Sequence, residues 1–135
     1  MKNLATFTII AFSAILLLFT ACEKDQLDDT SAVNIEITSP KAGQTFSLGD
    51  TVRIEASISA MKEMHGWEVV IRQKSDNKIV FEKDRHTHGT SLKVNQTWVN
   101  NVSQHSDMIL EVTVALDHSG NNLKTETVNF HCHPN

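Results

Sequence analysis

Positive charge is scarce in this sequence and is nowhere concentrated. Among the 135 residues, 12 are Lys or Arg and 16 are Asp or Glu, which gives a formal net charge of −4 at pH 7 with neutral histidines. Proteins that bind nucleic acid gather basic side chains on one face or segment, because much of the affinity comes from neutralised phosphates. The sequence has no Arg-rich run or basic stripe, so nucleic acid is not expected as a partner.

The motifs of common catalytic sites are also missing. The sequence has no Gly-rich phosphate-binding loop, no helical zinc-protease motif and no nucleophile elbow, each of which places the groups that its chemistry needs. A Cys/His nucleophile would require a thiol that a neighbouring base activates within a rigid site. The cysteine that could serve, Cys132, stands in the last few residues of the sequence. The sequence therefore predicts a protein that is not an enzyme.

The opening segment, MKNLATFTIIAFSAILLLFTAC, has the layout of a secretory signal peptide. Lys2 supplies the positive start, and residues 4–19 form an uncharged, mostly apolar run. The final four letters, FTAC, resemble the lipobox of bacterial lipoproteins, although Phe19 stands where that motif usually has an aliphatic residue. The resemblance implies removal of residues 1–21, acylation of Cys22 with palmitate or a similar chain, and attachment to the lipid bilayer. An uncleaved transmembrane anchor or plain secretion is the alternative, since about 18 apolar residues can span a bilayer.

The next segment, EKDQLDDTSA, contains four acidic residues, one lysine and no periodic apolar pattern. Such a composition cannot bury enough apolar surface to fold, so residues 22–32 are expected to form an acylated, acidic tether. Acidic residues directly after the lipid cysteine also resemble the surface-export signal of some Gram-negative lipoproteins. The expected location is the outer membrane of the cell envelope, facing either the periplasm or the cell surface. With Cys22 acylated, Cys132 would have no partner for an intramolecular disulfide.

After the tether, apolar residues recur with a period of two, which is typical of half-buried β-strands. In one run, Val52, Ile54, Ala56 and Ile58 alternate with polar side chains, and no later segment has a convincing helical period. Turn-forming residues separate seven such runs. The runs cover residues 33–38, 51–59, 67–73, 78–83, 91–98, 108–116 and 123–130. Seven short strands at this spacing predict one all-β sandwich domain over residues 33–135.

The turns between these runs carry a family resemblance. The segment ITSPKAGQTFSLGDTVRIEASIS is similar to the opening of bacterial immunoglobulin-like domains, and ALDHSGN resembles the Asp-x-x-Gly-Asn turn before their final strand. HTHG, TW and the later His-rich segment also look like an uncharacterised family of immunoglobulin-like lipoproteins. The resemblance implies a seven-stranded immunoglobulin-like β-sandwich. The sequence has no tyrosine and no inter-sheet cysteine pair, so neither a tyrosine corner nor antibody-like recognition is implied.

The strand order of such a sandwich sorts the seven histidines between its two ends. Consecutive strands run in opposite directions, so the connections after the second, fourth and sixth strands share one end of the domain. Four histidines fall in those connections and three belong to the opposite end. The first group is His65, His86, His88 and His118, and the second is His105, His131 and His133.

The first group is a suitable set of ligands for a metal ion. In an extended chain, residues i and i+2 point the same way with Cα atoms ~6.6 Å apart, so His86 and His88 can aim both imidazoles at one ion. His65 and His118 would complete a four-nitrogen site for Zn²⁺ or Cu²⁺, with Zn–N distances of ~2.0–2.1 Å. In the alternative interpretation, these histidines are ordinary solvated residues of polar turns.

Neighbouring residues offer supporting roles at the same end. A carboxylate of Asp117 or Asp84 can orient an imidazole ring by accepting a hydrogen bond. The thioethers of Met61 and Met64 would suit a softer Cu(I) ion. Alternatively, the two methionines cap the core, for which their flexible side chains are well suited.

The segment FHCHPN places Cys132 between His131 and His133, and with His105 these residues form a possible second site for metal or redox chemistry. Side chains alternate along a strand, so both histidines would face away from Cys132 if the last strand continued through them. In the alternative interpretation, Cys132 is a small buried residue that follows Phe130 into the core.

These patterns lead to one principal hypothesis and one alternative for function. The principal hypothesis is a membrane-anchored lipoprotein whose immunoglobulin-like domain binds Zn²⁺ or Cu²⁺ through loop histidines. In the alternative, the same loop end contacts a protein or glycan partner, or the domain is an accessory subunit of a surface complex that pairs through a sheet edge.

Overall fold

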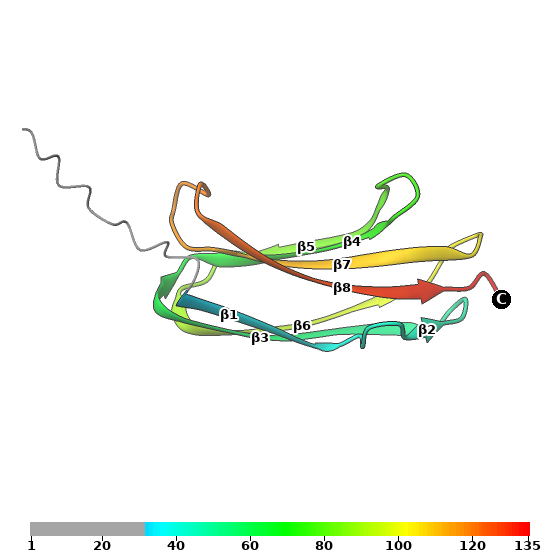
Figure 1. Cartoon of the computed structure of the whole chain (residues 1–135), viewed down its shortest axis with the longest axis horizontal. Helices are drawn as coiled ribbons and strands as arrows, with labels where there is room; N and C mark the ends of the chain where they lie inside the picture. Colours follow the sequence, from blue (N-terminus) through cyan, green and yellow to red (C-terminus); the bar gives the residue numbers. More distant parts are fainter. Residues whose placement is uncertain (1–31) are drawn as a thin grey trace, which may run out of the picture.

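The computed structural model describes residues 32–135, which form a two-layered β-sandwich (Figure 1). The predicted signal peptide, Cys22 and nearly all of the predicted tether lie outside the described residues. Within residues 32–135, no helix is long and apolar enough to cross a membrane. The strands are β1 (Val33–Ser39), β2 (Thr45–Phe46), β3 (Thr51–Met64), β4 (Gly66–Gln73), β5 (Ile79–Arg85), β6 (Gly89–Val99), β7 (Ser106–Ala115) and β8 (Leu123–Cys132).

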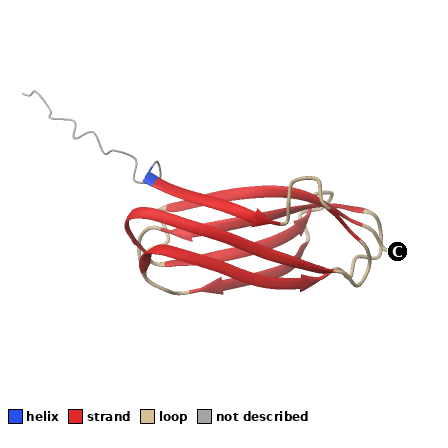
Figure 2. Ribbon diagram, turned by 90° about the horizontal axis from the view of Figure 1, so that it is seen from below, coloured by secondary structure: helices blue, strands red, loops and turns tan. Residues whose placement is uncertain are grey.

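The strands form two open sheets that face each other, which confirms the predicted all-β sandwich (Figure 2). One sheet has three strands in the order β1-β3-β6, and the other has five in the order β2-β8-β7-β4-β5. The chain therefore passes from one sheet to the other after β1, β2, β3, β5 and β6. The connections after β3 and β5, and the turn between β7 and β8, lie at one end of the sandwich. The connection between β6 and β7 lies at the other end, beside the end of β8 (Figure 1).

Residues 32–135 form eight strands, one more than the sequence predicts, because of the short strand β2. Its two residues pair in parallel with the end of β8, with Thr45 opposite His131 and Phe46 opposite Cys132. Two residues are too few to show an alternating pattern, so this strand has no signature in the sequence. Strand β2 pairs with the edge of β8 that faces away from β7, and it thereby holds the last residues of β8 in place.

Strand β3 continues five residues beyond its predicted end at Ser59. The apolar alternation stops there because Met61, Lys62 and Glu63 are exposed. Backbone pairing with β6 nevertheless resumes after a register shift, with Met64 opposite Gly89. The predicted loop between the second and third long strands is therefore reduced to His65.

The core lies between the two sheets and consists of the alternating apolar residues of both layers. The side chains of Val52, Ile54, Val112 and Val114 are fully buried, as their period-two spacing predicts. This continuous apolar layer holds the sheets face to face, and it determines where each connection leaves the sandwich.

Candidate metal centres

His65 is the whole connection between β3 and β4, at the point where the chain passes from one sheet to the other. Its backbone N–H donates to the carbonyl oxygen of Ala115 at 2.8 Å. The preceding residue, Met64, has a fully buried side chain in the core. These contacts on either side leave the His65 backbone little freedom, so its ring has a defined position at this end.

Gly66 brings the end of β5 close to His65. Gly66 has a φ of 148°, and a Cβ atom at this residue would lie 2.7 Å from the carbonyl oxygen of Arg85 and 3.4 Å from the Cα atom of His86. Both the backbone conformation and the available space therefore favour glycine. The absence of a side chain lets the segment that carries His86 pack directly against β4.

Four histidines meet at this end, and with Glu63 they are called the first cluster below. The ring centroids of His65 and His118 are 3.9 Å apart, and those of His65 and His88 are 5.0 Å apart. The rings of His86 and His88 are 4.8 Å apart. Their Nε2 atoms are separated by 3.1 Å, close to the ~3.3 Å expected between two nitrogens bound to one tetrahedral Zn²⁺ ion.

His118 reaches this cluster from the turn between β7 and β8. The carboxylate of Asp117 accepts a hydrogen bond from the Asn121 N–H at 3.1 Å, and the Asn121 side chain donates to Ser119 Oγ at 3.0 Å. Burial acts to raise the pKa of Asp117, but hydrogen bonds from Ser119 and from backbone N–H groups outweigh it, and the pKa is lowered. The turn is thus held by its own polar groups and places His118 over His65.

Glu63 is the member of the first cluster that the sequence analysis missed. Its Oε1 atom is 3.3 Å from His88 Nδ1. Donor atoms of Glu63, His65 and His88 all lie within 4.8 Å of one another. A carboxylate that accepts the Nδ1–H of an imidazole directs the Nε2 lone pair toward a metal, and here Nε2 is the atom nearest His86. Once β3 is known to extend to Met64, the i, i+2 spacing of Glu63 and His65 explains why they lie together.

The Nδ1 atom of His65 is buried and has no hydrogen-bond partner among residues 32–135. Burial lowers the pKa of this imidazole, and charges on His118 and His88 lower it further, whereas Glu63 and Asp117 act in the opposite direction. The neutral ring is therefore favoured. A buried polar atom without a partner is costly, and a metal ion would satisfy it.

The other residues predicted to support this site have different positions. Asp84 lies within β5, opposite Glu68 of β4. Met64 belongs to the core, whereas Met61 is 85% exposed. The two thioethers do not share a site, and the structure gives no basis for the Cu(I) interpretation.

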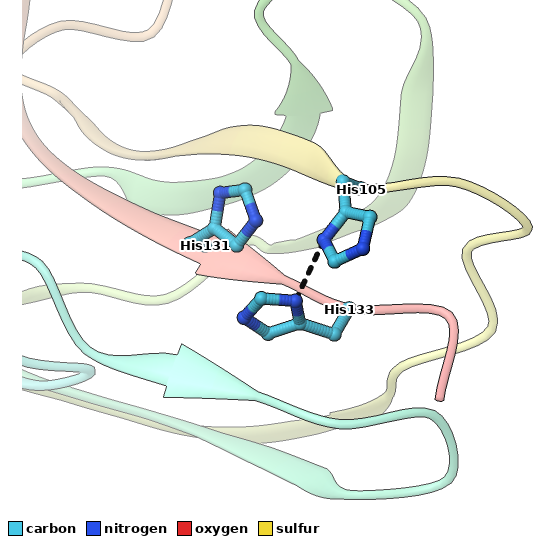
Figure 3. Close-up of side chains that lie close together, drawn as sticks. All are labelled: His105, His131 and His133. Atoms are coloured by element: carbon cyan, nitrogen blue, oxygen red, sulfur yellow. Dashed lines mark hydrogen bonds between the residues drawn. The ribbon is translucent and has the colours of Figure 1, made fainter.

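A second cluster consists of His105, His131 and His133 (Figure 3). It lies at the opposite end of the sandwich, where β6 connects to β7 and β8 ends (Figure 1). Donor atoms of these three residues lie within 4.8 Å of one another. Ring centroids are 4.5 Å apart for His105 and His133 and 4.6 Å apart for His131 and His133. Ring contacts in both clusters thus confirm the predicted sorting of the histidines. Whether either cluster binds metal remains a prediction.

Cys132 is separated from the second cluster. Its side chain is fully buried in the core, while its neighbours His131 and His133 are only partly buried. Burial raises the pKa of this thiol to about 11, with a smaller contribution from the charge of Asp50. The alternation along β8 turns the thiol inward and the flanking imidazoles outward. The structure thus corrects the second candidate site: it contains the three histidines but not Cys132, which follows the alternative interpretation.

A scan against models of known protein families finds no match to the chain, and no curated protein matches it.

Proposed function

We propose that this protein is a lipid-anchored component of the bacterial cell envelope whose β-sandwich binds a divalent transition metal at the first cluster. The observation that carries the proposal is the convergence of four imidazoles from three separate connections. Within this cluster the donor atoms of Glu63, His65 and His88 lie within 4.8 Å of one another, and the rings of His86 and His118 lie beside those of His88 and His65. The buried, unpartnered Nδ1 atom of His65 adds a nitrogen that still needs a partner.

The donor atoms of the first cluster narrow the class of metal. Imidazole nitrogens suit Zn²⁺, Cu²⁺ and neighbouring divalent ions, whereas Mg²⁺ and Ca²⁺ prefer oxygen ligands. Cu(I) favours thiolate or thioether sulfur, and the side chain of Met64 is packed in the hydrophobic core. We therefore expect Zn²⁺ or Cu²⁺. Four imidazoles would fill a tetrahedral coordination sphere, which fits metal capture, handling or sensing better than catalysis.

The proposed anchor follows from the lipobox-like FTAC segment and the acidic residues after it. Acylation of Cys22 would hold the sandwich at the outer membrane through residues 23–32, facing the periplasm or the cell surface. Several acyl chains bind a bilayer far more firmly than one, at ~0.8 kcal/mol per buried CH₂. The first cluster would then present its metal close to the membrane surface.

Metal binding can be tested by titrating the full chain, purified in detergent without a polyhistidine tag, with ZnCl₂ and CuCl₂ in a calorimeter. A His105→Ala/His133→Ala background removes two imidazoles from the opposite end and leaves the first cluster intact. We expect this chain to bind one ion, and we expect the further change His86→Ala/His88→Ala to weaken binding at least 100-fold. Unchanged affinity after that second change would overturn the assignment.

The anchor is tested separately, because metal binding does not depend on it. Incorporation of labelled palmitate should require Cys22, and Cys22→Ala should release the protein from the membrane fraction. Protease treatment of intact cells distinguishes surface from periplasmic display. Labelling that persists in Cys22→Ala would contradict lipidation at this residue.

A further inference from the structure

The second cluster has fewer protein donors than the first. It consists of three imidazoles, and the nearest sulfur donor in sequence, Cys132, is buried in the core. His105 is exposed, and His131 and His133 are partly buried, so solvent reaches this end. Three histidines whose donor atoms lie within 4.8 Å of one another can bind an ion and still leave a coordination position free.

A carboxylate already orients one of these rings. His131 Nδ1 lies 2.8 Å from Asp107 Oδ1, because the two residues are directly opposite each other on β8 and β7. The carboxylate can only accept, so Nδ1 carries the hydrogen and the lone pair is on Nε2. This carboxylate–histidine pair is the arrangement that metal sites use to orient an imidazole and to make it more basic.

The other two rings share a hydrogen bond that a metal can replace. His133 Nδ1 and His105 Nδ1 are 2.7 Å apart (Figure 3), so one Nδ1–H must donate to the other nitrogen. If the donor ring moves its proton to its own Nε2, both Nδ1 lone pairs face the same point. Two nitrogens on one tetrahedral ion are ~3.3 Å apart, so a small rotation of the side chains makes room for it.

The backbone holds these rings from several directions. His131 N–H donates to the Gln44 carbonyl at 2.9 Å, and His133 N–H donates to the Phe46 carbonyl at 2.8 Å. The buried side chain of Asn100 donates to the His133 carbonyl at 3.0 Å. Strand β2 and Asn100 thus fix the backbone of residues 131–133, which carries two of the three rings.

From this geometry we infer that His105, His131 and His133 form a second metal site, with Asp107 positioning His131 and one coordination position open to a small exogenous ligand. The site takes a divalent ion such as Zn²⁺, Co²⁺ or Cu²⁺, and water or a small anion occupies the open position. It lies at the end of the sandwich opposite the first cluster and shares no residue with it. The chain therefore binds two ions whose coordination differs, and the second site does not depend on the first.

Co²⁺ is the probe, since its visible absorption reports coordination by imidazole. The full chain carrying His86→Ala/His88→Ala, in detergent and without a polyhistidine tag, is titrated with CoCl₂ and then with sodium azide. We expect one equivalent of Co²⁺ to give a visible spectrum that azide shifts, because azide enters the open position. The additional changes His105→Ala/His133→Ala should abolish the spectrum.

The role of Asp107 has its own measurement. Asp107→Asn removes the negative charge while it leaves all three rings in place, and we expect 10–100-fold weaker Co²⁺ binding. Glu126→Gln, which removes an exposed carboxylate from β8, the strand that carries His131, serves as the control and should leave Co²⁺ affinity unchanged. A spectrum that survives His105→Ala/His133→Ala would overturn the site. A three-histidine spectrum that azide leaves unchanged would overturn the open position, and unchanged affinity in Asp107→Asn would overturn the positioning role.

Discussion

The carbonyl oxygen of Arg85 occupies the space that a Cβ atom on residue 66 would need, at a distance of 2.7 Å. Glycine at this position therefore lets β5 end directly against the start of β4. His86 follows Arg85, and His65 precedes Gly66, so this close approach of two backbones brings both histidines to the same end. A residue without a side chain thus shapes the first cluster.

Replacement of Gly66 by alanine should damage this cluster without removing a ligand. The Cβ atom would push the Arg85–His86 backbone away and would also strain the φ of 148°. We expect a loss of at least about 2 kcal/mol in the free energy of unfolding and weaker metal binding at the first cluster. Denaturant unfolding and calorimetric titration measure the two effects. Gly43→Ala is the matched control, because its φ is also positive but no atom lies within 4 Å of the added Cβ. It should leave metal affinity at the first cluster unchanged.

Replacement of Asn100 by alanine should weaken the structural support of the second cluster, although Asn100 is not one of its residues. The Asn100 side chain donates to the carbonyls of Phe46 and His133 and accepts from the Val102 N–H. Its loss leaves buried groups without partners, at a cost of about 1–3 kcal/mol in the free energy of unfolding. We also expect weaker Co²⁺ binding at the second cluster and an unchanged first cluster. The adjacent, exposed Asn101 gives the control, since Asn101→Ala should alter stability by less than about 0.5 kcal/mol. Equal effects of the two changes would contradict the proposed support.

The thiol of Cys132 should be unreactive in the folded protein. It is fully buried, and burial raises its pKa from 9.0 to about 11, whereas reaction with a thiol reagent requires an exposed thiolate as the nucleophile. In a Cys22→Ser chain, a disulfide reagent should react rapidly only after unfolding in guanidinium. Because the raised pKa belongs to the folded state, stability should be constant below about pH 9 and fall between about pH 9 and 11. A Cys132→Ala chain should lack this part of the pH dependence, and rapid labelling of the native thiol would show that the burial is wrong.

Metal binding at the first cluster should weaken in acid, because protons compete with the metal for the ring nitrogens. His65 should lose its metal-binding capacity only below pH 6.5, since burial lowers its pKa from that value. Titrations with Zn²⁺ between about pH 5 and 8 should show constant affinity at the upper end and a decline below about pH 6. Affinity that increases toward low pH would exclude imidazole nitrogens as the ligands.

The positions of the histidines were predictable because direction reverses with each long strand. His65, His86 and His118 follow alternate strands, and this places them at one end without any knowledge of which strands pair. The inward orientation of Cys132 could also be predicted, because Cys132 lies two residues after the inward-facing Phe130 on the same strand. What the sequence did not show was where this last strand ends.

Glu63 and the short strand β2 were not predictable by the same reasoning. The sequence around Glu63 loses its apolar alternation, and the strand continues there because its backbone pairs with residues near Gly89. Strand β2 likewise exists because the end of β8 lies beside it. Both features arise from contacts between segments far apart in the chain, so the local sequence pattern does not reveal them.

The passage of the chain between sheets at His65 has a mechanical consequence. Cys132 is a free thiol, so no disulfide joins the two layers of the described sandwich. An ion held by His65, His86 and His118 would join three connections that are distant in sequence, one of which belongs wholly to the five-stranded sheet. Such a bond closes long loops in the unfolded chain and reduces its entropy, as a disulfide does. The supply of metal would then control how readily the two layers separate.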